Sequence, residues 1–210
     1  MKRALITGGS GAIGKALVKE FSSDYEVIFT RFKNNEAQSG ATGIKCDITD
    51  REAVLKIADE YPHFDLLINN AGISQVKLFT DLKPEDWQRM LAVNLTGAFN
   101  VTQAVLPAMI RRKSGVVINI SSIWGEIGAS CEVHYSAAKA GLIGFSKALA
   151  KEVEPSGIRV HYIAPGAVES PMNAGFSEEE MLDACTFNKG GKILTPEDIA
   201  KEVRCLTEAL

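Results

Sequence analysis

ALITGGSGAIG, at residues 4–14, is the stretch that decides the fold of this chain. Its apolar start, Ala4-Leu5-Ile6, predicts a buried strand, and apolar residues at 13, 17 and 21 predict a helix that buries one stripe. The glycines therefore lie between a strand and a helix N-terminus, which is the context that a dinucleotide-binding turn requires. Glycine lets the backbone approach a pyrophosphate closely, and N–H groups at the helix start favour its negative charge. A purely structural turn is the alternative.

The same order of strand and helix repeats along the rest of the chain. Apolar runs predict strands near 3–7, 25–30, 43–46, 64–69, 115–120 and 158–163. This alternation predicts an α/β fold of the Rossmann type, with a doubly wound parallel sheet in a three-layer α/β/α arrangement. A length of 210 residues, 46% hydrophobic and 23% charged, suits a single domain over 1–210.

A second signal is the segment Tyr135-Ser136-Ala137-Ala138-Lys139. If this stretch is helical, Tyr135 and Lys139 stand at i and i+4 on one face, and the ammonium is expected to lower the pKa of the phenol from its usual ~10. Such a pair can act as general acid and base. Ser122 follows an apolar strand, so its hydroxyl is expected at the carboxyl end of the sheet, within reach of a substrate carbonyl. For an isolated Tyr and Lys, an ordinary solvated helix face is the alternative.

The residues after the second strand bear on the choice of cofactor. An acidic side chain there would bind the ribose 2′-hydroxyl of NAD, whereas a basic one accommodates the 2′-phosphate of NADP. No carboxylate stands at this strand end, but Arg31 and Lys33 follow it. We therefore expect NADP(H) to be preferred, with NAD(H) possible. The alternative is that both cations only solvate a loop.

Taken together, these motifs resemble the short-chain dehydrogenase/reductase family. The resemblance is carried by TGGSGAIG at 7–14, CD at 46–47, NNAG at 69–72, Asn94, Ser122, YSAAK at 135–139 and PG at 165–166. It runs from Met1 to about Leu210, and residues 135–153 look most similar to bacterial 3-oxoacyl-[acyl carrier protein] reductases. One departure is Ala12, which stands where the family has the middle glycine of its turn.

The resemblance implies an NAD(P)H-dependent oxidoreductase that interconverts a ketone and a secondary alcohol. It implies a catalytic tetrad of Asn94, Ser122, Tyr135 and Lys139. In this tetrad Tyr135 delivers the proton, Lys139 also binds the ribose hydroxyls, and Asn94 holds a water that connects Lys139 to solvent. The substrate would be a small-molecule carbonyl compound or one linked to an acyl carrier protein. A reductase of another ketone, sugar or steroid-like alcohol, and a non-catalytic nucleotide-binding regulatory protein, are the alternatives.

The resemblance further implies that Asp47 and Ile48 flank the adenine and that Asn70 and Gly72 line the ribose and phosphates. The nicotinamide would be embraced by Pro165, Gly166, Val168 and Ser170. For Asp47, Asn69 and Asn70 a simple turn role is the alternative. The complete set of predicted cofactor-binding residues is Gly8, Ser10, Gly11, Ala12, Ile13, Gly14, Arg31, Lys33, Asp47, Ile48, Asn70, Ala71, Gly72, Tyr135, Lys139, Pro165, Gly166, Val168 and Ser170.

Two expectations concern the last quarter of the chain. Residues at about 169–195 are expected to form the substrate loop, with a helix start at 177–180. A helix beginning near Thr195 is expected to run to the end of the chain, so that the last strand of the family is lacking. The sheet would then finish at the strand near 158–163 with an uncovered edge. A homodimer or homotetramer is expected, with the helices at 84–112 and 134–153 as a possible dimer face.

Composition excludes several other classes of protein. A net charge of −3 argues against a nucleic-acid partner. The four cysteines are widely separated and predict free thiols and no metal site. The sequence shows no signal peptide and no apolar run long enough for a bilayer, so a cytoplasmic protein without membrane contact is expected.

Residues 111–113 are a candidate docking patch for an acidic carrier protein, or cations that complement a helix C-terminus.

Overall fold

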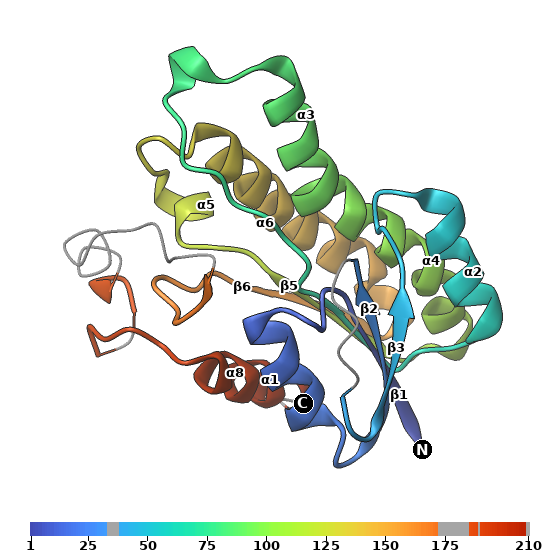
Figure 1. Ribbon diagram of the computed structural model, residues 1–210. Helices are drawn as coiled ribbons and strands as arrows, with labels where there is room; N and C mark the ends of the chain where they lie inside the picture. Colours follow the sequence, from blue (N-terminus) through green and yellow to red (C-terminus); the bar gives the residue numbers. More distant parts are fainter. Residues whose placement is uncertain (33–37, 172–184, 189, 209–210) are drawn as a thin grey trace.

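The sheet of the protein is parallel throughout, as predicted. The computed structural model describes residues 1–32, 38–171, 185–188 and 190–208. Within them, six strands form one sheet in the order β3-β2-β1-β4-β5-β6 (Figure 1). The strands are β1 (Lys2–Ile6), β2 (Tyr25–Arg31), β3 (Ala41–Lys45), β4 (Leu66–Asn69), β5 (Gly115–Ile120) and β6 (Ile158–Ile163). In the part of the chain that is described, β6 forms one edge of the sheet, which agrees with the prediction.

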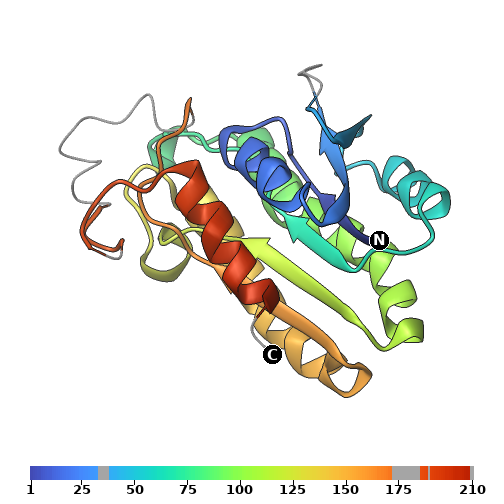
Figure 2. The ribbon, with the colours of Figure 1, turned by 90° about the horizontal axis from the view of Figure 1, so that it is seen from below.

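Helices cover both faces of this sheet, so the three-layer arrangement is confirmed. Helices α1 (Ala12–Phe21) and α8 (Pro196–Glu208) lie on one face, and α2 (Arg51–Glu60), α4 (Gly97–Arg112) and α6 (Val133–Val153) lie on the other (Figures 1 and 2). The shorter helices are α3 (Pro84–Leu91) and α5 (Trp124–Ile127), with 3-10 turns at Phe79–Asp81 and Glu154–Ser156. Residues Ala92–Thr96 form a π-helical segment between α3 and α4. None of the helices that the structure describes is both long and apolar enough to cross a bilayer.

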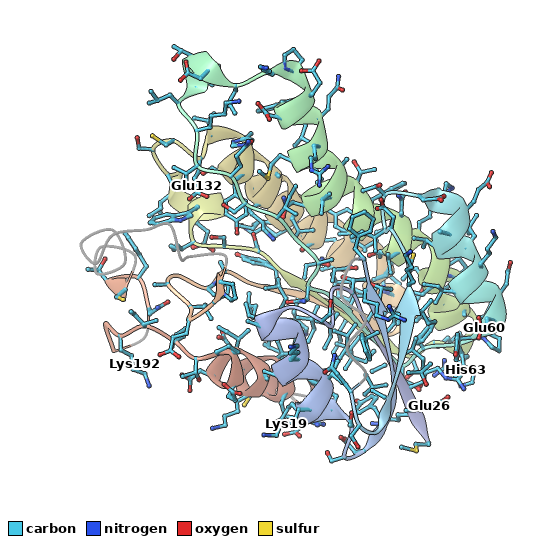
Figure 3. All side chains as sticks on the ribbon, in the orientation of Figure 1. Lys19, Glu26, Glu60, His63, Glu132 and Lys192 are labelled. Atoms are coloured by element: carbon cyan, nitrogen blue, oxygen red, sulfur yellow. The ribbon has the colours of Figure 1, made fainter. Side chains whose placement is uncertain are left out.

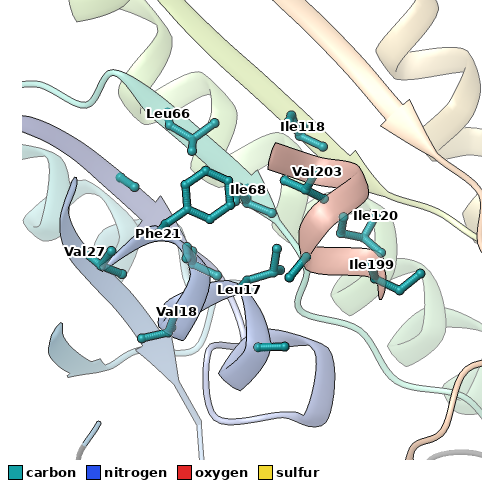
Figure 4. Close-up of a cluster of buried hydrophobic side chains, with 14 of the residues drawn as sticks. Leu17, Val18, Phe21, Val27, Leu66, Ile68, Ile118, Ile120, Ile199 and Val203 are labelled. Carbon is teal, nitrogen blue, oxygen red and sulfur yellow. The ribbon is translucent and has the colours of Figure 1, made fainter. Parts of the chain in front are cut away.

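The core between the sheet and α1 explains why the predicted helix forms. Leu17 and Phe21 are fully buried, and Ile13 packs against the same cluster, so the stripe predicted from the sequence faces the sheet. Figure 4 shows Leu17 and Phe21 among side chains from the neighbouring strands and from α8. Since each fully buried large apolar side chain contributes about 1.5–3 kcal/mol, this cluster fixes α1 firmly on the sheet.

Arg204 fastens α8 to the last turn of α1. Its guanidinium carbon lies 4.1 Å from the centroid of the Phe21 ring, a cation–π arrangement. The same group donates hydrogen bonds to the Glu20 carbonyl oxygen at 2.6 Å and to the Asp24 carboxylate at 2.8 and 2.9 Å. The hydrogen bond from Arg204 lowers the pKa of Asp24. Helices that are far apart in the sequence are thus joined by one side chain.

Candidate active site

The glycine-rich turn lies at the carboxyl end of β1, where the chain folds tightly back on itself. A Cβ atom added to Gly14 would lie 2.1 Å from the Gly8 carbonyl oxygen. Gly8 has a φ of +65°, and a Cβ there would lie 2.8 Å from the Ala71 Cα. Neither position can hold a larger residue without a shift of the backbone, so both glycines are required by the close approach of the chain.

The outer side of this turn is open. Gly11 is exposed, and a Cβ there would meet only the Gly8 carbonyl oxygen, at 3.5 Å. The first turn of α1 reads Ala12-Ile13-Gly14-Lys15 and contains no carboxylate. The first N–H groups of a helix have no partner inside the helix and attract anions. These residues therefore fit a cofactor pyrophosphate, and the methyl group of Ala12, which is only partly buried, does not close the turn.

Thr7 joins the turn to the end of β4. Its Oγ1 accepts hydrogen bonds from the backbone N–H groups of Asn70 and Ala71, each at 3.0 Å. The Asn70 side-chain amide donates back to the carbonyl oxygens of Thr7 and Gly8, at 3.0 and 3.2 Å. Asn70 thus stabilises the turn after β4 through hydrogen bonds to the backbone, as its alternative role required. Its neighbour Asn69 instead donates into the buried core.

Asp47 and Ile48 are both committed to contacts within the protein. The Asp47 Oδ1 accepts from the Thr49 N–H at 2.9 Å and from the Thr49 hydroxyl at 2.8 Å, which is a turn stabilised by its own side chain. Ile48 is buried in the core on the α2 and α4 side. Their proposed contact with the adenine stays a prediction.

The remaining predicted cofactor residues follow β2 and β6 in the sequence. Arg31 is the last residue of β2 and is partly buried, whereas Lys33 lies outside the described residues. After β6, Val168 is buried and forms a bridge with Leu194. Ser170 is partly buried, and most of the predicted substrate loop, including the helix start at 177–180, falls outside the described residues.

The four residues of the predicted tetrad lie close to one another and are all buried. Tyr135 and Lys139 share α6, as predicted, and the Lys139 Nζ lies 5.7 Å from the centroid of the Tyr135 ring. This Nζ donates to the Ile120 carbonyl oxygen at 2.9 Å. Ser122, just after β5, accepts from the Trp124 N–H at 3.2 Å, and its hydroxyl lowers the pKa of Tyr135.

The acidity of Tyr135 differs from the expectation. Burial raises the pKa of Tyr135 to about 12; the hydrogen bond from Ser122 opposes this rise, and the charge of Glu132 adds to it. Burial also lowers the pKa of Lys139 to about 8. The prediction that the pKa of Tyr135 lies below its usual value is therefore wrong for this structure, because desolvation of the phenol is the largest effect on it. At neutral pH the phenol is protonated and can donate its proton.

Asn94 stands inside the π-helical segment. Its amide nitrogen donates to the Ile73 carbonyl oxygen at 2.9 Å, and its Oδ1 accepts from the Ile73 N–H at 3.3 Å. A Cβ on Gly72 would lie 2.7 Å from the Asn94 Oδ1 and 3.5 Å from the Lys139 Nζ, so both side chains border this glycine. The structure thus brings Asn94 beside Lys139 and shows that it also fixes the loop after β4. π-Helical turns are often found at functional sites.

Sequence reasoning missed the network that holds this loop against the start of α6. Ser74 donates to the buried Glu132 carboxylate at 2.5 Å, and Gln75 lies 3.1 Å from the Nε2 of His134. The Lys77 N–H donates to the Cys131 carbonyl oxygen at 2.7 Å. Nothing in the sequence marked Ser74 or Gln75 as partners of Glu132 and His134.

The basic residues 111–113 lie at the other end of the molecule. Arg112 forms an ion pair with Asp65 and donates to the Phe64 carbonyl oxygen at 3.3 Å. These partners stand at the amino end of β4, close to His63, whereas Glu132 lies at the opposite end in Figure 3. The cluster therefore ends α4 far from Ser122, which favours the interpretation as helix-end cations.

Comparison with known proteins agrees with this geometry. The family model described as short chain dehydrogenase matches residues 2–181. The 3-oxoacyl-[acyl-carrier-protein] reductase of Escherichia coli strain K12 is 37% identical, with 98% of this chain and 89% of the relative covered. That of Aquifex aeolicus is 38% identical, with 98% and 80% covered.

Solved structures show the same likeness. A crystal structure of the 3-oxoacyl-[acyl-carrier protein] reductase from Brucella melitensis has a TM-score of 0.89 at 31% identity, with 98% of this chain and 84% of that chain covered. A structure of ElxO with NADP bound has a TM-score of 0.85 at 30% identity, with 98% and 90% covered. The predicted homodimer or homotetramer and the cytoplasmic location stay predictions.

Proposed function

The chain belongs to the short-chain dehydrogenase family and is a nicotinamide-dependent oxidoreductase, and we propose that it reduces a 3-oxoacyl thioester to the 3-hydroxyacyl thioester. The observation that carries this proposal is the buried group of Ser122, Tyr135 and Lys139 at the carboxyl end of β5, beside a turn that fits a dinucleotide. The reductases named above act on acyl-carrier-protein-linked substrates, which supports a carrier-linked thioester here.

Each residue of the tetrad has a proposed part in the reaction. When bound, the nicotinamide cofactor supplies the hydride. Ser122 donates a hydrogen bond to the substrate carbonyl oxygen, and Tyr135 donates the proton that this oxygen gains. Lys139 binds the ribose hydroxyls, and its charge stabilises the phenolate that remains. Asn94 holds the loop at Ile73 in place and, with a bound water, connects Lys139 to solvent.

A substrate panel tests this function. We expect purified protein to oxidise NADPH with acetoacetyl-CoA, and to do so at least about tenfold more efficiently, by kcat/KM, than with a simple ketone, a keto sugar or a steroid ketone. A reversed order would contradict the thioester proposal and favour a reductase of small ketones. Tight binding of NADPH without turnover of any of these compounds would favour a regulatory nucleotide-binding protein.

We further propose that the preferred cofactor is NADP(H). Arg31 ends β2 where the ribose 2′-position would lie, and a guanidinium can form charge-assisted hydrogen bonds with a phosphate. Arg31→Ala should therefore lower kcat/KM for NADPH about tenfold and leave kcat/KM for NADH unchanged. Steady-state kinetics with both cofactors measures this, and Lys19→Ala, which removes a cation from the far end of α1, is the control. Equal losses with both cofactors would show that Arg31 does not contact the 2′-phosphate.

A further inference from the structure

Asn188 is a buried polar residue that the tetrad does not use. It is 7% exposed and lies in the turn that follows Cys185. Its Oδ1 accepts a hydrogen bond from the Gly166 N–H at 2.9 Å. Its amide nitrogen donates to the Ala167 carbonyl oxygen at 2.8 Å and to the Lys192 carbonyl oxygen at 2.9 Å. One side chain therefore ties two backbone segments together.

The segment that Asn188 holds lies directly beside the tetrad. The Pro165 carbonyl oxygen accepts from the Ile123 N–H at 2.9 Å, one residue after Ser122. On its other side, the Ala167 carbonyl oxygen also accepts from the Leu194 N–H at 3.0 Å. Residues 165–167 are thus attached to the β5 end through Ile123, and to residues 188–194 through Asn188 and Leu194.

Only an amide side chain of this length meets all three partners. Asparagine offers a carbonyl oxygen and two N–H donors, and both donors and the oxygen are used here. An aspartate would present a second oxygen to the carbonyls of Ala167 and Lys192, where a donor is needed. An alanine would remove one hydrogen-bond partner from the partly buried Gly166 N–H and one from each of the Ala167 and Lys192 carbonyl oxygens.

We propose that Asn188 is a positioning residue that holds Gly166 and Ala167 in the geometry that receives the nicotinamide half of the cofactor. The inference rests on the proposed function, because Pro165, Gly166, Val168 and Ser170 are cofactor contacts only if the protein binds NADP(H) as proposed above. Asn188 itself touches backbone and not the reacting atoms. Its loss should therefore weaken cofactor binding and loosen the nicotinamide geometry without removing any group of the tetrad.

The test compares Asn188→Ala with Arg112→Ala. Arg112 also donates to a partly buried backbone carbonyl oxygen, that of Phe64, and forms an ion pair with Asp65. Both partners lie at the opposite end of the strands, so the loss of Arg112 should destabilise the fold without touching the site. NADPH binding is measured by the change in its fluorescence, and folding by thermal unfolding. We expect Asn188→Ala to weaken NADPH binding about tenfold and Arg112→Ala to leave it unchanged. The two variants should lose a similar amount of thermal stability.

Asn188→Asp supplies a second readout that general destabilisation would not produce. Facing two carbonyl oxygens in a buried position, this carboxyl should have a raised pKa. When protonated it regains a donor for the Ala167 or Lys192 carbonyl, while its other oxygen still accepts from Gly166. The affinity of Asn188→Asp for NADPH, divided by that of the wild type at the same pH, should therefore rise as the pH is lowered from 8 to 6.

The outcomes separate this inference from the proposed function. If both Asn188 variants bound NADPH with wild-type affinity, whatever their thermal stability, the positioning role would be overturned and the proposed reductase function would stand. An affinity of Asn188→Asp that does not depend on pH relative to wild type would also contradict it. Failure of the wild-type protein itself to bind NADPH or NADH would overturn both, since Asn188 would then have no cofactor to position.

Discussion

Tyr135→Phe should lower kcat for carbonyl reduction by about 10³-fold, because it removes the hydroxyl that the proposed mechanism uses as proton donor while it preserves the ring. The phenol is buried, and burial holds the pKa of Tyr135 at about 12, so the donor is protonated throughout the neutral range. The substrate oxygen gains negative charge as hydride arrives. Without this proton the charge is not neutralised, so the alkoxide forms much less favourably. The measurement is NADPH oxidation with acetoacetyl-CoA under saturating cofactor.

Two controls make this result specific. NADPH binding by Tyr135→Phe should stay within about threefold of wild type, because Lys139 and the glycine-rich turn are unchanged. Tyr25→Phe removes a phenol at the start of β2, at the opposite end of the sheet, and should keep full activity. Substantial turnover by Tyr135→Phe, above about one tenth of the wild-type kcat, would mean that another group or a water delivers the proton.

Gly14→Ala should be the most damaging single change in the glycine-rich turn. Helix propensity alone predicts a gain of about 1 kcal/mol, since alanine is a better helix former than glycine. The added Cβ, however, would lie 2.1 Å from the Gly8 carbonyl oxygen and 2.7 Å from the Gly9 Cα, and these are backbone atoms that cannot rotate away. We expect the free energy of unfolding, measured in urea, to fall by about 3 kcal/mol, with loss of NADPH binding as α1 moves from its place.

Gly11→Ala is the matched control for this effect. A Cβ on Gly11 would lie at an ordinary contact distance of 3.5 Å from the same Gly8 oxygen, and the φ of Gly11 is −76°, which alanine adopts freely. Its free energy of unfolding should stay within about 1 kcal/mol of wild type. If the two alanine variants were equally stable, the close packing of Gly14 on Gly8 would not be what fixes the turn.

Most of the fold could be predicted because its signals are local. The stripe of Ile13, Leu17 and Phe21 and the apolar runs of the strands depend only on neighbouring residues, and both the elements and the parallel sheet are confirmed. The position of Ser122 at the end of β5 and the shared helix of Tyr135 and Lys139 follow from the same periodicity. Element ends were less accurate; β4, for example, begins at Leu66 and not at residue 64.

The parts that could not be predicted depend on contacts between distant segments. Asn188 bonds to Gly166, and Arg204 stacks on Phe21, across separations that carry no periodic signal. The π-helical turn around Asn94 has no recognised pattern of residues, so the sequence indicated only a helical region there. The pKa of Tyr135 was misjudged because the spacing to Lys139 was visible in the sequence whereas the depth of burial was not.

The Arg204 contact connects cofactor binding to the thermodynamic stability of the C-terminal helix. A ligand held at the N-terminus of α1 stabilises the folded chain by RT ln(1 + [L]/Kd), which is about 2.7 kcal/mol at a hundredfold excess over Kd. Because α8 rests on α1 through Phe21 and Arg204, part of that energy reaches residues 196–208, which contribute no residue to the tetrad. If detachment of α8 loosens α1 and weakens the binding of the cofactor, bound cofactor should make that detachment rarer, and limited proteolysis with and without NADPH would measure the effect.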